Sequence, residues 1–282
     1  MTRFVSSPLP SSPATTPTAR PAEPPARFGD LLASEWIKTR SLRSTPWVLA
    51  FTILFVIGSG AVATLADKAA GSEPGSFLAY DAFPAAGYMT LMLVSASMGA
   101  LAVVGEYGSG LIRTTSVAVP ARGAVVLAKA VVTAALWAAV GTVASIGSFL
   151  VSQAVLGGHD AAVSISHPDV VRPLVASVLL APVCAVVGLG FGVLLRHAAG
   201  TMVTTVFTLL MLGTMFSEGN RWSAGIRHAM VSASWTRLVQ TWEPDPGSLG
   251  YTATLPGSWA VYVLWPLISI CLAVVVVRRR DV

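Results

Sequence analysis

The sequence contains few charged residues. They make up 11% of the 282 residues, whereas hydrophobic residues make up 54% and the mean hydropathy is +0.71. Soluble domains carry about 25% charged residues, because their surfaces face water. The shortage excludes an ordinary soluble domain and indicates a protein of the membrane.

Lysine is scarcer still, and its placement excludes one class of enzyme. The three lysines are Lys38, Lys68 and Lys129, and none of them follows a glycine. A phosphate-binding P-loop requires a Gly-Lys pair at the start of a helix. We therefore expect no ATP hydrolysis by this chain.

Residues for other hydrolytic chemistry are missing as well. The four histidines lie in predicted loops and form no His-Glu-x-x-His zinc pair. The run Gly108-Ser109-Gly110 is similar to the Gly-x-Ser-Gly of intramembrane serine proteases. However, Tyr107 replaces the first glycine, and no predicted span supplies a histidine to activate the serine. We expect no catalytic residue, no cofactor and no metal site in this chain.

The two cysteines, Cys184 and Cys271, each lie inside a predicted span. Nothing in the sequence requires a disulfide between them, because that bond needs two helices in close register. We expect both side chains to be buried as small apolar groups.

What the chain does contain is six long apolar stretches. Each is close to the roughly 20 helical residues that span about 30 Å of hydrocarbon. None of the six cores contains Asp, Glu, Lys, Arg or His, so the ionisable residues that ion-coupled carriers place inside spans are absent. The predicted fold class is an all-α membrane protein with six transmembrane helices, at residues 47–66, 84–104, 131–151, 174–195, 199–216 and 257–277.

Basic residues are distributed unevenly between these spans. With both termini in the cytoplasm, thirteen lysine and arginine residues lie in inside segments and five lie outside. Basic residues are retained on the cytoplasmic side, where they meet anionic lipid. The pattern predicts a multi-pass protein of the cell (plasma) membrane with both termini cytoplasmic. Because the basic residues are spread along the membrane margins, membrane lipid is the expected partner, and nucleic acid is not.

The chain is predicted to have two parts. Residues 1–27 contain seven of the 18 prolines among Ser, Thr and Ala, which predicts a disordered cytoplasmic leader. Residues 28–282 form the six-span domain. It begins with an amphipathic interfacial helix at residues 28–44, with a lipid-facing side formed by Phe28, Leu31, Leu32, Trp36 and Ile37 and a wet side formed by Asp30, Glu35, Lys38 and Arg43.

Two connecting segments are unusual. The segment between spans 2 and 3 carries Glu106, Tyr107, Gly108, Gly110 and Arg113. It is either a surface helix that presents polar residues to a soluble partner, with glycines for sharp bends, or a solvated loop. The external segment 217–256 carries three tryptophans over residues 222–242, which predicts one or two helices at the outer interface.

Small residues recur along spans 2 and 3. They suit close helix packing, and they suit the lining of a transport pathway equally well; packing is the preferred interpretation. These residues are Ser95, Ser97, Gly99, Gly141, Ser145, Gly147 and Ser148.

Three motifs, taken together, are similar to those of one known family. The first is the run from Glu35 to Thr45 that precedes span 1, Glu-Trp-Ile-Lys-Thr-Arg-Ser-Leu-Arg-Ser-Thr. The second is Gly-Glu-Tyr-Gly-Ser-Gly at residues 105–110, followed by Leu-Ile-Arg-Thr-Thr. The third is Pro-Ala-Arg at residues 120–122, followed by Lys129. Together with the six spans, these motifs resemble the permeases of type-2 ABC exporters, particularly those of high-GC Gram-positive bacteria, and the similarity covers about residues 28–282.

The resemblance implies a subunit that supplies half of a transmembrane pathway. A second permease subunit would pair with it as a homo- or heterodimer, and a separate P-loop ATPase subunit would bind the ATP. A cytoplasmic coupling helix would lie between spans 2 and 3. The residues that would meet the ATPase are Glu35, Lys38, Arg40, Arg43, Glu106, Tyr107, Gly108, Gly110 and Arg113.

The expected function is therefore the transmembrane permease of an ATP-driven exporter, and not an enzyme in its own right. The nearly uncharged spans favour a hydrophobic or amphipathic cargo. The alternative is a membrane scaffold or sensor that recruits partners without moving a substrate. A soluble ATPase bound at residues 106–113 would discriminate between the two.

Overall fold

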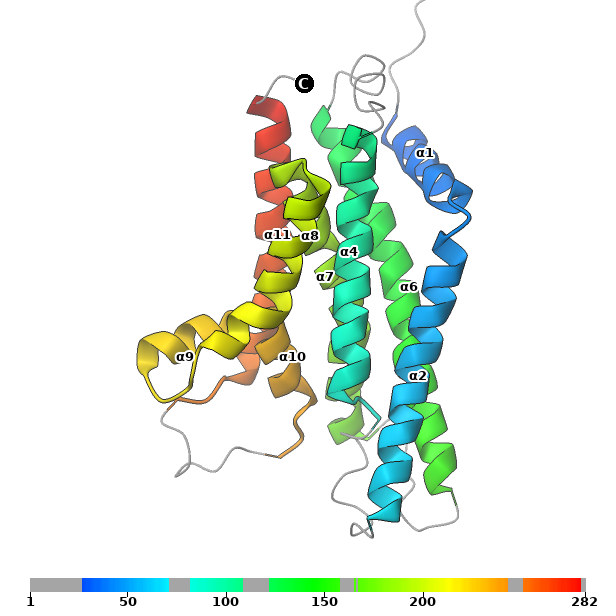
Figure 1. Cartoon of the computed structure of the whole chain (residues 1–282), viewed down its shortest axis with the longest axis vertical. Coiled ribbons are helices and arrows are strands. Elements are labelled where there is room, and N and C mark those ends of the chain that lie inside the picture. Colours follow the sequence, from blue (N-terminus) through cyan, green and yellow to red (C-terminus); the bar gives the residue numbers. More distant parts are fainter. Residues whose placement is uncertain are drawn as a thin grey trace, which may run out of the picture.

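The computed structural model describes residues 27–70, 82–108, 122–157, 165, 167–242 and 251–279. Every regular element within these ranges is a helix, and six helical segments are long and apolar enough to cross a membrane (Figure 1). The predicted all-α, six-span fold class is thereby confirmed. Residues 1–26 of the predicted leader (residues 1–27) lie outside the described residues, as do Gly110, Arg113 and the coupling helix expected between spans 2 and 3.

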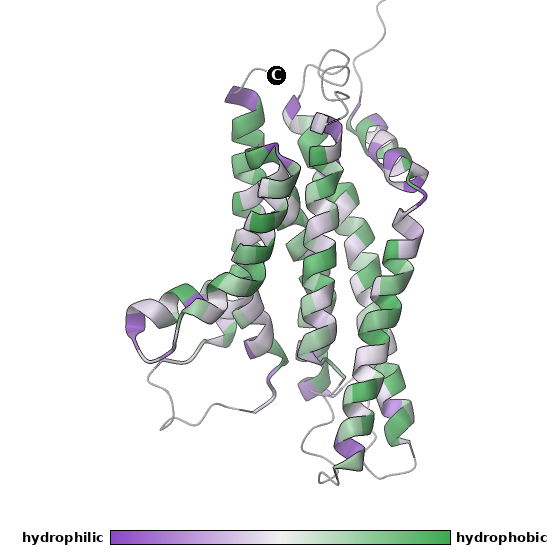
Figure 2. Cartoon of the chain, viewed as in Figure 1, coloured by the Kyte–Doolittle hydropathy of each residue, from purple (hydrophilic) through white to green (hydrophobic). Residues whose placement is uncertain are grey.

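The six spans agree closely with the apolar stretches of the sequence. Their residues are mostly hydrophobic, and hydrophilic residues gather near the helix ends (Figure 2). The fifth span changes from α-helix to a π turn and then a 3-10 turn. The spans are α2 (Thr45–Ala69), α4 (Ala85–Gly108), α6 (Arg122–Leu156), α7 (Pro168–Leu195), α8 (Ala198–Val206) continued by η1 (Phe207–Met211) and η2 (Leu212–Met215), and α11 (Leu255–Arg279).

Helix α7 forms the centre of the bundle, and small residues allow its neighbours to pack tightly against it. A Cβ atom added at Gly99 of α4 would collide with the backbone of Ala185, and one added at Gly188 would collide with the backbone of Ala96. Two backbones can approach this closely only where side chains are absent. Gly141 of α6 meets α7 in the same way. These glycines therefore serve helix packing, the preferred interpretation of the small-residue pattern.

Three of the four serines of that pattern are buried too, and Ser97 is half-buried. Ser95, Ser145 and Ser148 are fully buried, and Ser148 donates a hydrogen bond to the backbone oxygen of Ala82 at 2.7 Å. Of the two cysteines, Cys184 is buried as expected, whereas Cys271 is exposed on α11. The expectation of burial was wrong for Cys271 because apolar residues on the outer side of a membrane helix can face lipid.

The predicted external helices are α9 (Arg221–His228) and α10 (Val231–Val239). Figure 1 shows α9 projecting sideways from the bundle. Trp222 and Trp242 are exposed, whereas Trp235 is 3% exposed and stacks on Tyr88 with ring centroids 5.2 Å apart. The indole N–H of Trp235 donates to the hydroxyl of Ser177 at 3.2 Å. Helix α10 is therefore part of the core, because Trp235 ties it to α4 and α7.

Candidate functional site: a buried ion-pair cluster

Four charged side chains meet at one end of the bundle. Helix α1 (Phe28–Ser41) lies there beside the first turns of α6 and the last turn of α4 (Figure 1). Glu35 and Lys38 come from α1, Glu106 from α4 and Lys129 from α6. We call these four residues the ion-pair cluster. It joins three helices whose contributing residues lie far apart in the sequence.

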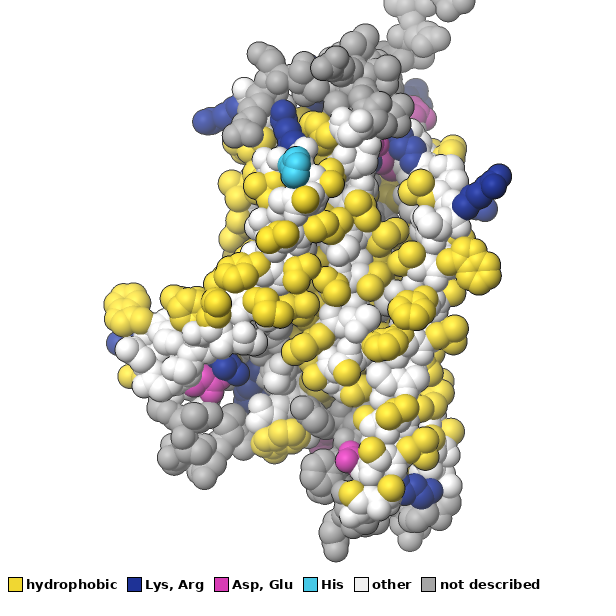
Figure 3. All heavy atoms as spheres, viewed as in Figure 1, with side chains coloured by type: hydrophobic (Ala, Val, Ile, Leu, Met, Phe, Trp, Pro, Cys, Tyr) yellow, Lys and Arg dark blue, Asp and Glu magenta, His cyan; other side chains and the backbone are white. Residues whose placement is uncertain are grey.

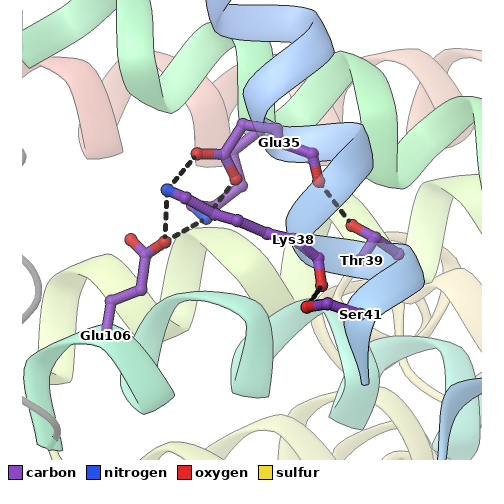
Figure 4. Close-up of polar contacts among 6 residues, drawn as sticks. Glu35, Lys38, Thr39, Ser41 and Glu106 are labelled. Atoms are coloured by element: carbon purple, nitrogen blue, oxygen red, sulfur yellow. Dashed lines mark hydrogen bonds and ion pairs between the residues drawn. The ribbon is translucent and has the colours of Figure 1, made fainter. Parts of the chain in front are cut away.

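Each ammonium group of the cluster contacts both carboxylates (Figure 4). Lys38 Nζ lies 2.7 Å from Glu35 Oε1 and 3.0 Å from Glu106 Oε1. Lys129 Nζ lies 2.5 Å from Glu35 Oε2 and 2.9 Å from Glu106 Oε1. Two positive and two negative charges form a closed ring with no net formal charge.

Burial makes this ring sensitive to the loss of any member. The side chains of Glu35, Lys129 and Glu106 are 6%, 8% and 13% exposed, whereas that of Lys38 is 41% exposed. A buried charge is tolerated when it is paired, but removing its partner typically costs about 3–5 kcal/mol. Lys129 has the most buried ammonium, and it is the link from α6 to both carboxylates.

Lys38 is the most accessible member of the cluster, and the direction of its pKa shift shows whether burial or the two carboxylates have the larger effect on it. Partial burial acts to lower the pKa of the Lys38 ammonium, because it removes water from the charged form. Hydrogen bonds and charge attraction from Glu35 and Glu106 outweigh this effect and raise the pKa above its ordinary value of 10.5. Lys38 therefore carries its positive charge throughout the neutral range.

The orientation of α1 differs in part from the sequence prediction. Asp30 and Arg43 are exposed as expected, and Trp36 and Ile37 also face outward. Glu35 and Lys38 were expected on a wet side, but they point toward α4 and α6; Leu31 and Leu32 share that inner side and are half-buried. The prediction was wrong here because the cluster replaces the water that Glu35 and Lys38 would otherwise require.

The last turn of α4 is held from a second side. The Arg196 guanidinium carbon lies 5.0 Å from the centre of the Tyr107 ring, within the range of a cation–π contact. Arg196 adopts φ 54°, ψ 14° and ends α7, and His197 caps α8 by accepting a hydrogen bond from the Gly200 amide at 3.2 Å. The turn between α7 and α8 is therefore short, and Arg196 packs it on α4.

The structure thus brings together some of the residues predicted for the site. Glu35, Lys38 and Glu106 meet in the cluster, and Tyr107 lies beside it on α4. Arg40 and Arg43 are exposed on α1 and just after it. Gly108 ends α4, and a Cβ atom there would meet nothing, so the described contacts do not require a glycine at this position.

Lys129 and Arg196 were not among the predicted site residues. The signal for Lys129 was present, because it is the single lysine in the long apolar run of residues 123–156 and a buried ammonium requires a carboxylate. No sequence signal points to Arg196 as a partner of Tyr107.

Fold and site together define a multi-pass helical membrane protein in which a short preceding helix is ionically fastened to two spans. A comparison with protein-family models found no match, and neither did a comparison with curated proteins.

Proposed function

We propose that this chain is the membrane-spanning permease subunit of an ATP-driven exporter, with the ATPase on a separate subunit. The proposal includes location in the plasma membrane with both termini cytoplasmic, which places α1 and the ion-pair cluster on the cytoplasmic side. It also includes pairing with a second permease subunit and a hydrophobic or amphipathic cargo.

The observation that carries the proposal is the ion-pair cluster. Glu106 and Lys129 lie on α4 and α6, the two helices on either side of segment 109–121, and Glu35 and Lys38 fasten α1 to both of them. An ATPase that binds segment 109–121 or α1 would therefore push on a single connected unit. Movement of that unit would be passed to α4 and α6 as a tilt of whole spans.

The cluster changes the role assigned to Glu106. A coupling residue at the tip of a lever would contact the ATPase directly, whereas Glu106 is engaged with Lys38 and Lys129 inside the chain. We assign it to the internal part of the lever, which makes the lever rigid. Direct contact with the ATPase is left to α1 and to the residues that follow α4.

The first experiment asks whether an ATPase is present. Purification of the tagged full chain in mild detergent at native expression, followed by mass spectrometry, is expected to recover a stoichiometric P-loop ATPase. Recovery of the chain without an ATPase, even after crosslinking, contradicts the proposal and favours the scaffold or sensor function.

The second experiment tests the lever with the recovered complex. Glu106→Lys places a third ammonium beside Lys38 and Lys129, so we expect cargo-stimulated ATP hydrolysis to be lost while the chain still inserts into the membrane. Glu218→Lys is the matched control, because Glu218 pairs with Arg227 outside the cluster, at 3.3 Å. Equal coupling in the Glu106→Lys variant and the wild type would remove Glu106 from the lever.

A further inference from the structure

The outer face of α1 combines exposed apolar side chains with two exposed arginines. Trp36 and Ile37 are 43% and 66% exposed, and Leu42, just after the helix, is 56% exposed. Arg40 lies four residues after Trp36 and three after Ile37, so the three side chains share one side of the helix. Arg43 follows in the turn to α2 and is also exposed. We call Trp36, Ile37, Arg40, Leu42 and Arg43 the corner patch.

The patch continues directly into the lipid-facing side of α2. Trp47, Phe51 and Leu54 are 79%, 61% and 69% exposed, and their spacing places them on one side of that helix. The exposed apolar side extends to Leu65, eighteen residues or about 27 Å beyond Trp47, close to the thickness of the hydrocarbon layer. Arg40 and Arg43 therefore stand just outside the hydrocarbon, at the height of the lipid headgroups.

The charge of the corner patch is not neutralised within the described part of the chain. No ion pair there joins Arg40 or Arg43 to a carboxylate, and Glu35 of the same helix faces inward to Lys129. Asp30, the other acidic residue of the helix, accepts a hydrogen bond from the Arg27 amide at 2.9 Å. It lies ten residues before Arg40, about 15 Å away along the helix axis. Figure 3 shows dark blue side chains standing away from the surface at this corner, above hydrophobic side chains.

We propose that the corner patch binds the headgroup of an anionic phospholipid. The two guanidinium groups hold the phosphate, because planar guanidinium donors match phosphate oxygens. Four apolar side chains insert beside the part of the acyl chains nearest the headgroup, as apolar and tryptophan side chains of interfacial helices do. They are Trp36, Ile37, Leu42 and Trp47. The unbroken continuation into the lipid-facing side of α2 favours a lipid over an acidic soluble protein.

The test measures lipid binding by the isolated full chain, so it does not depend on the exporter proposal. Delipidated protein is titrated with phosphatidylglycerol, phosphatidylcholine or inorganic phosphate, and bound lipid is counted by native mass spectrometry. A basic side chain near an anionic surface contributes about a fivefold gain in affinity. We expect the wild type to prefer phosphatidylglycerol to phosphatidylcholine by about tenfold or more.

The double variant Arg40→Gln/Arg43→Gln is expected to lose this preference and to bind phosphatidylcholine as before. Arg40→Lys/Arg43→Lys keeps the charge and is expected to retain most of the preference. Arg221→Gln is the matched control, because Arg221 is exposed on α9, away from the patch.

Three results would overturn the proposal. The first is a phosphatidylglycerol affinity of the Gln variant within twofold of the wild type, or an equal loss in Arg221→Gln. The second is displacement of phosphatidylglycerol by inorganic phosphate, which would indicate a site for free phosphate. The third is an unchanged lipid preference in the Gln variant with loss of a co-purifying acidic protein, which would assign the patch to that protein.

Discussion

Replacing Lys129 by methionine tests the ion-pair cluster most directly, because methionine keeps much of the side-chain length and removes the charge. Lys129 Nζ lies 2.5 Å from Glu35 and 2.9 Å from Glu106, and both of these carboxylates are largely buried. In the Lys129→Met variant, Lys38, which is 41% exposed, is the cluster's one remaining ammonium for its two carboxylates. The cluster then holds one unbalanced negative charge away from bulk water.

The expected loss is about 3 kcal/mol, the lower end of the range for breaking a buried pair, since Lys38 still contacts both carboxylates. We expect the loss to appear first in the docking of α1. Hydrogen exchange of the α1 amides measures the free energy of local opening. A loss of about 3 kcal/mol corresponds to exchange more than a hundredfold faster.

A second substitution tests whether the unbalanced charge is the cause of the loss. Adding Glu106→Gln to Lys129→Met leaves one carboxylate, Glu35, facing one ammonium, Lys38, so the charge is balanced again. We expect the double variant to exchange more slowly at α1 than Lys129→Met alone, a coupling that independent sites do not show. Lys68→Met is the control, because Lys68 is exposed and its Nζ contacts only the Val155 backbone oxygen among described atoms, at 3.3 Å. Additive losses, or an Lys129→Met variant indistinguishable from Lys68→Met, would refute the account.

Three further predictions concern pH and packing. Lys38 has a raised pKa in the folded chain, so its stabilising contribution is complete below pH 10.5 and is lost as the pH rises through the higher folded pKa. In the wild type, the hydrogen-exchange protection of the α1 amides, corrected for intrinsic exchange, should therefore fall over this alkaline range. The Lys38→Met variant should show no such fall. Gly188→Ala drives a Cβ into the Ala96 backbone and should cost at least about 2 kcal/mol in thermal unfolding, whereas Gly58→Ala, where a Cβ meets nothing, should be neutral or stabilising. Trp235→Ala removes a buried indole and should cost about 3–5 kcal/mol by the same measurement; a loss under 1 kcal/mol would show that α10 is not held by this side chain.

The sequence predicts the spans well because span formation depends on local properties. Length and hydropathy alone decide whether a segment can cross a membrane, so all six stretches were located and their ends differ from the helix ends by a few residues in most cases. The largest difference is at α6, which begins at Arg122, nine residues before the predicted span. The additional residues include Lys129, so the predicted boundary left a member of the cluster outside the predicted span.

The orientation of α1 was harder to predict because it depends on a distant residue. Glu35 meets Lys129 across 94 positions of the sequence, and no local pattern shows that pairing. Without the partner, helical periodicity assigns Glu35 to water, as it does for most exposed acids. Trp235 was misplaced for the same reason, since its partners Tyr88 and Ser177 lie on other spans. Local properties thus identified the elements, and long-range contacts decided which of their sides face the core.

Helix α1 has different chemistry on its two sides, and this limits how it can move. Rotation about its own axis would separate Glu35 from Lys129, and breaking such a buried pair costs about 3–5 kcal/mol. The same rotation would turn Trp36, Ile37 and Arg40 away from the headgroup layer. Movement of α1 together with α4 and α6 preserves both sets of contacts, so it is favoured over movement of α1 alone. The two sides are consequently separable by mutation: Lys129→Met should loosen α1 and leave the lipid preference, whereas Arg40→Gln/Arg43→Gln should remove the lipid preference and leave the cluster paired.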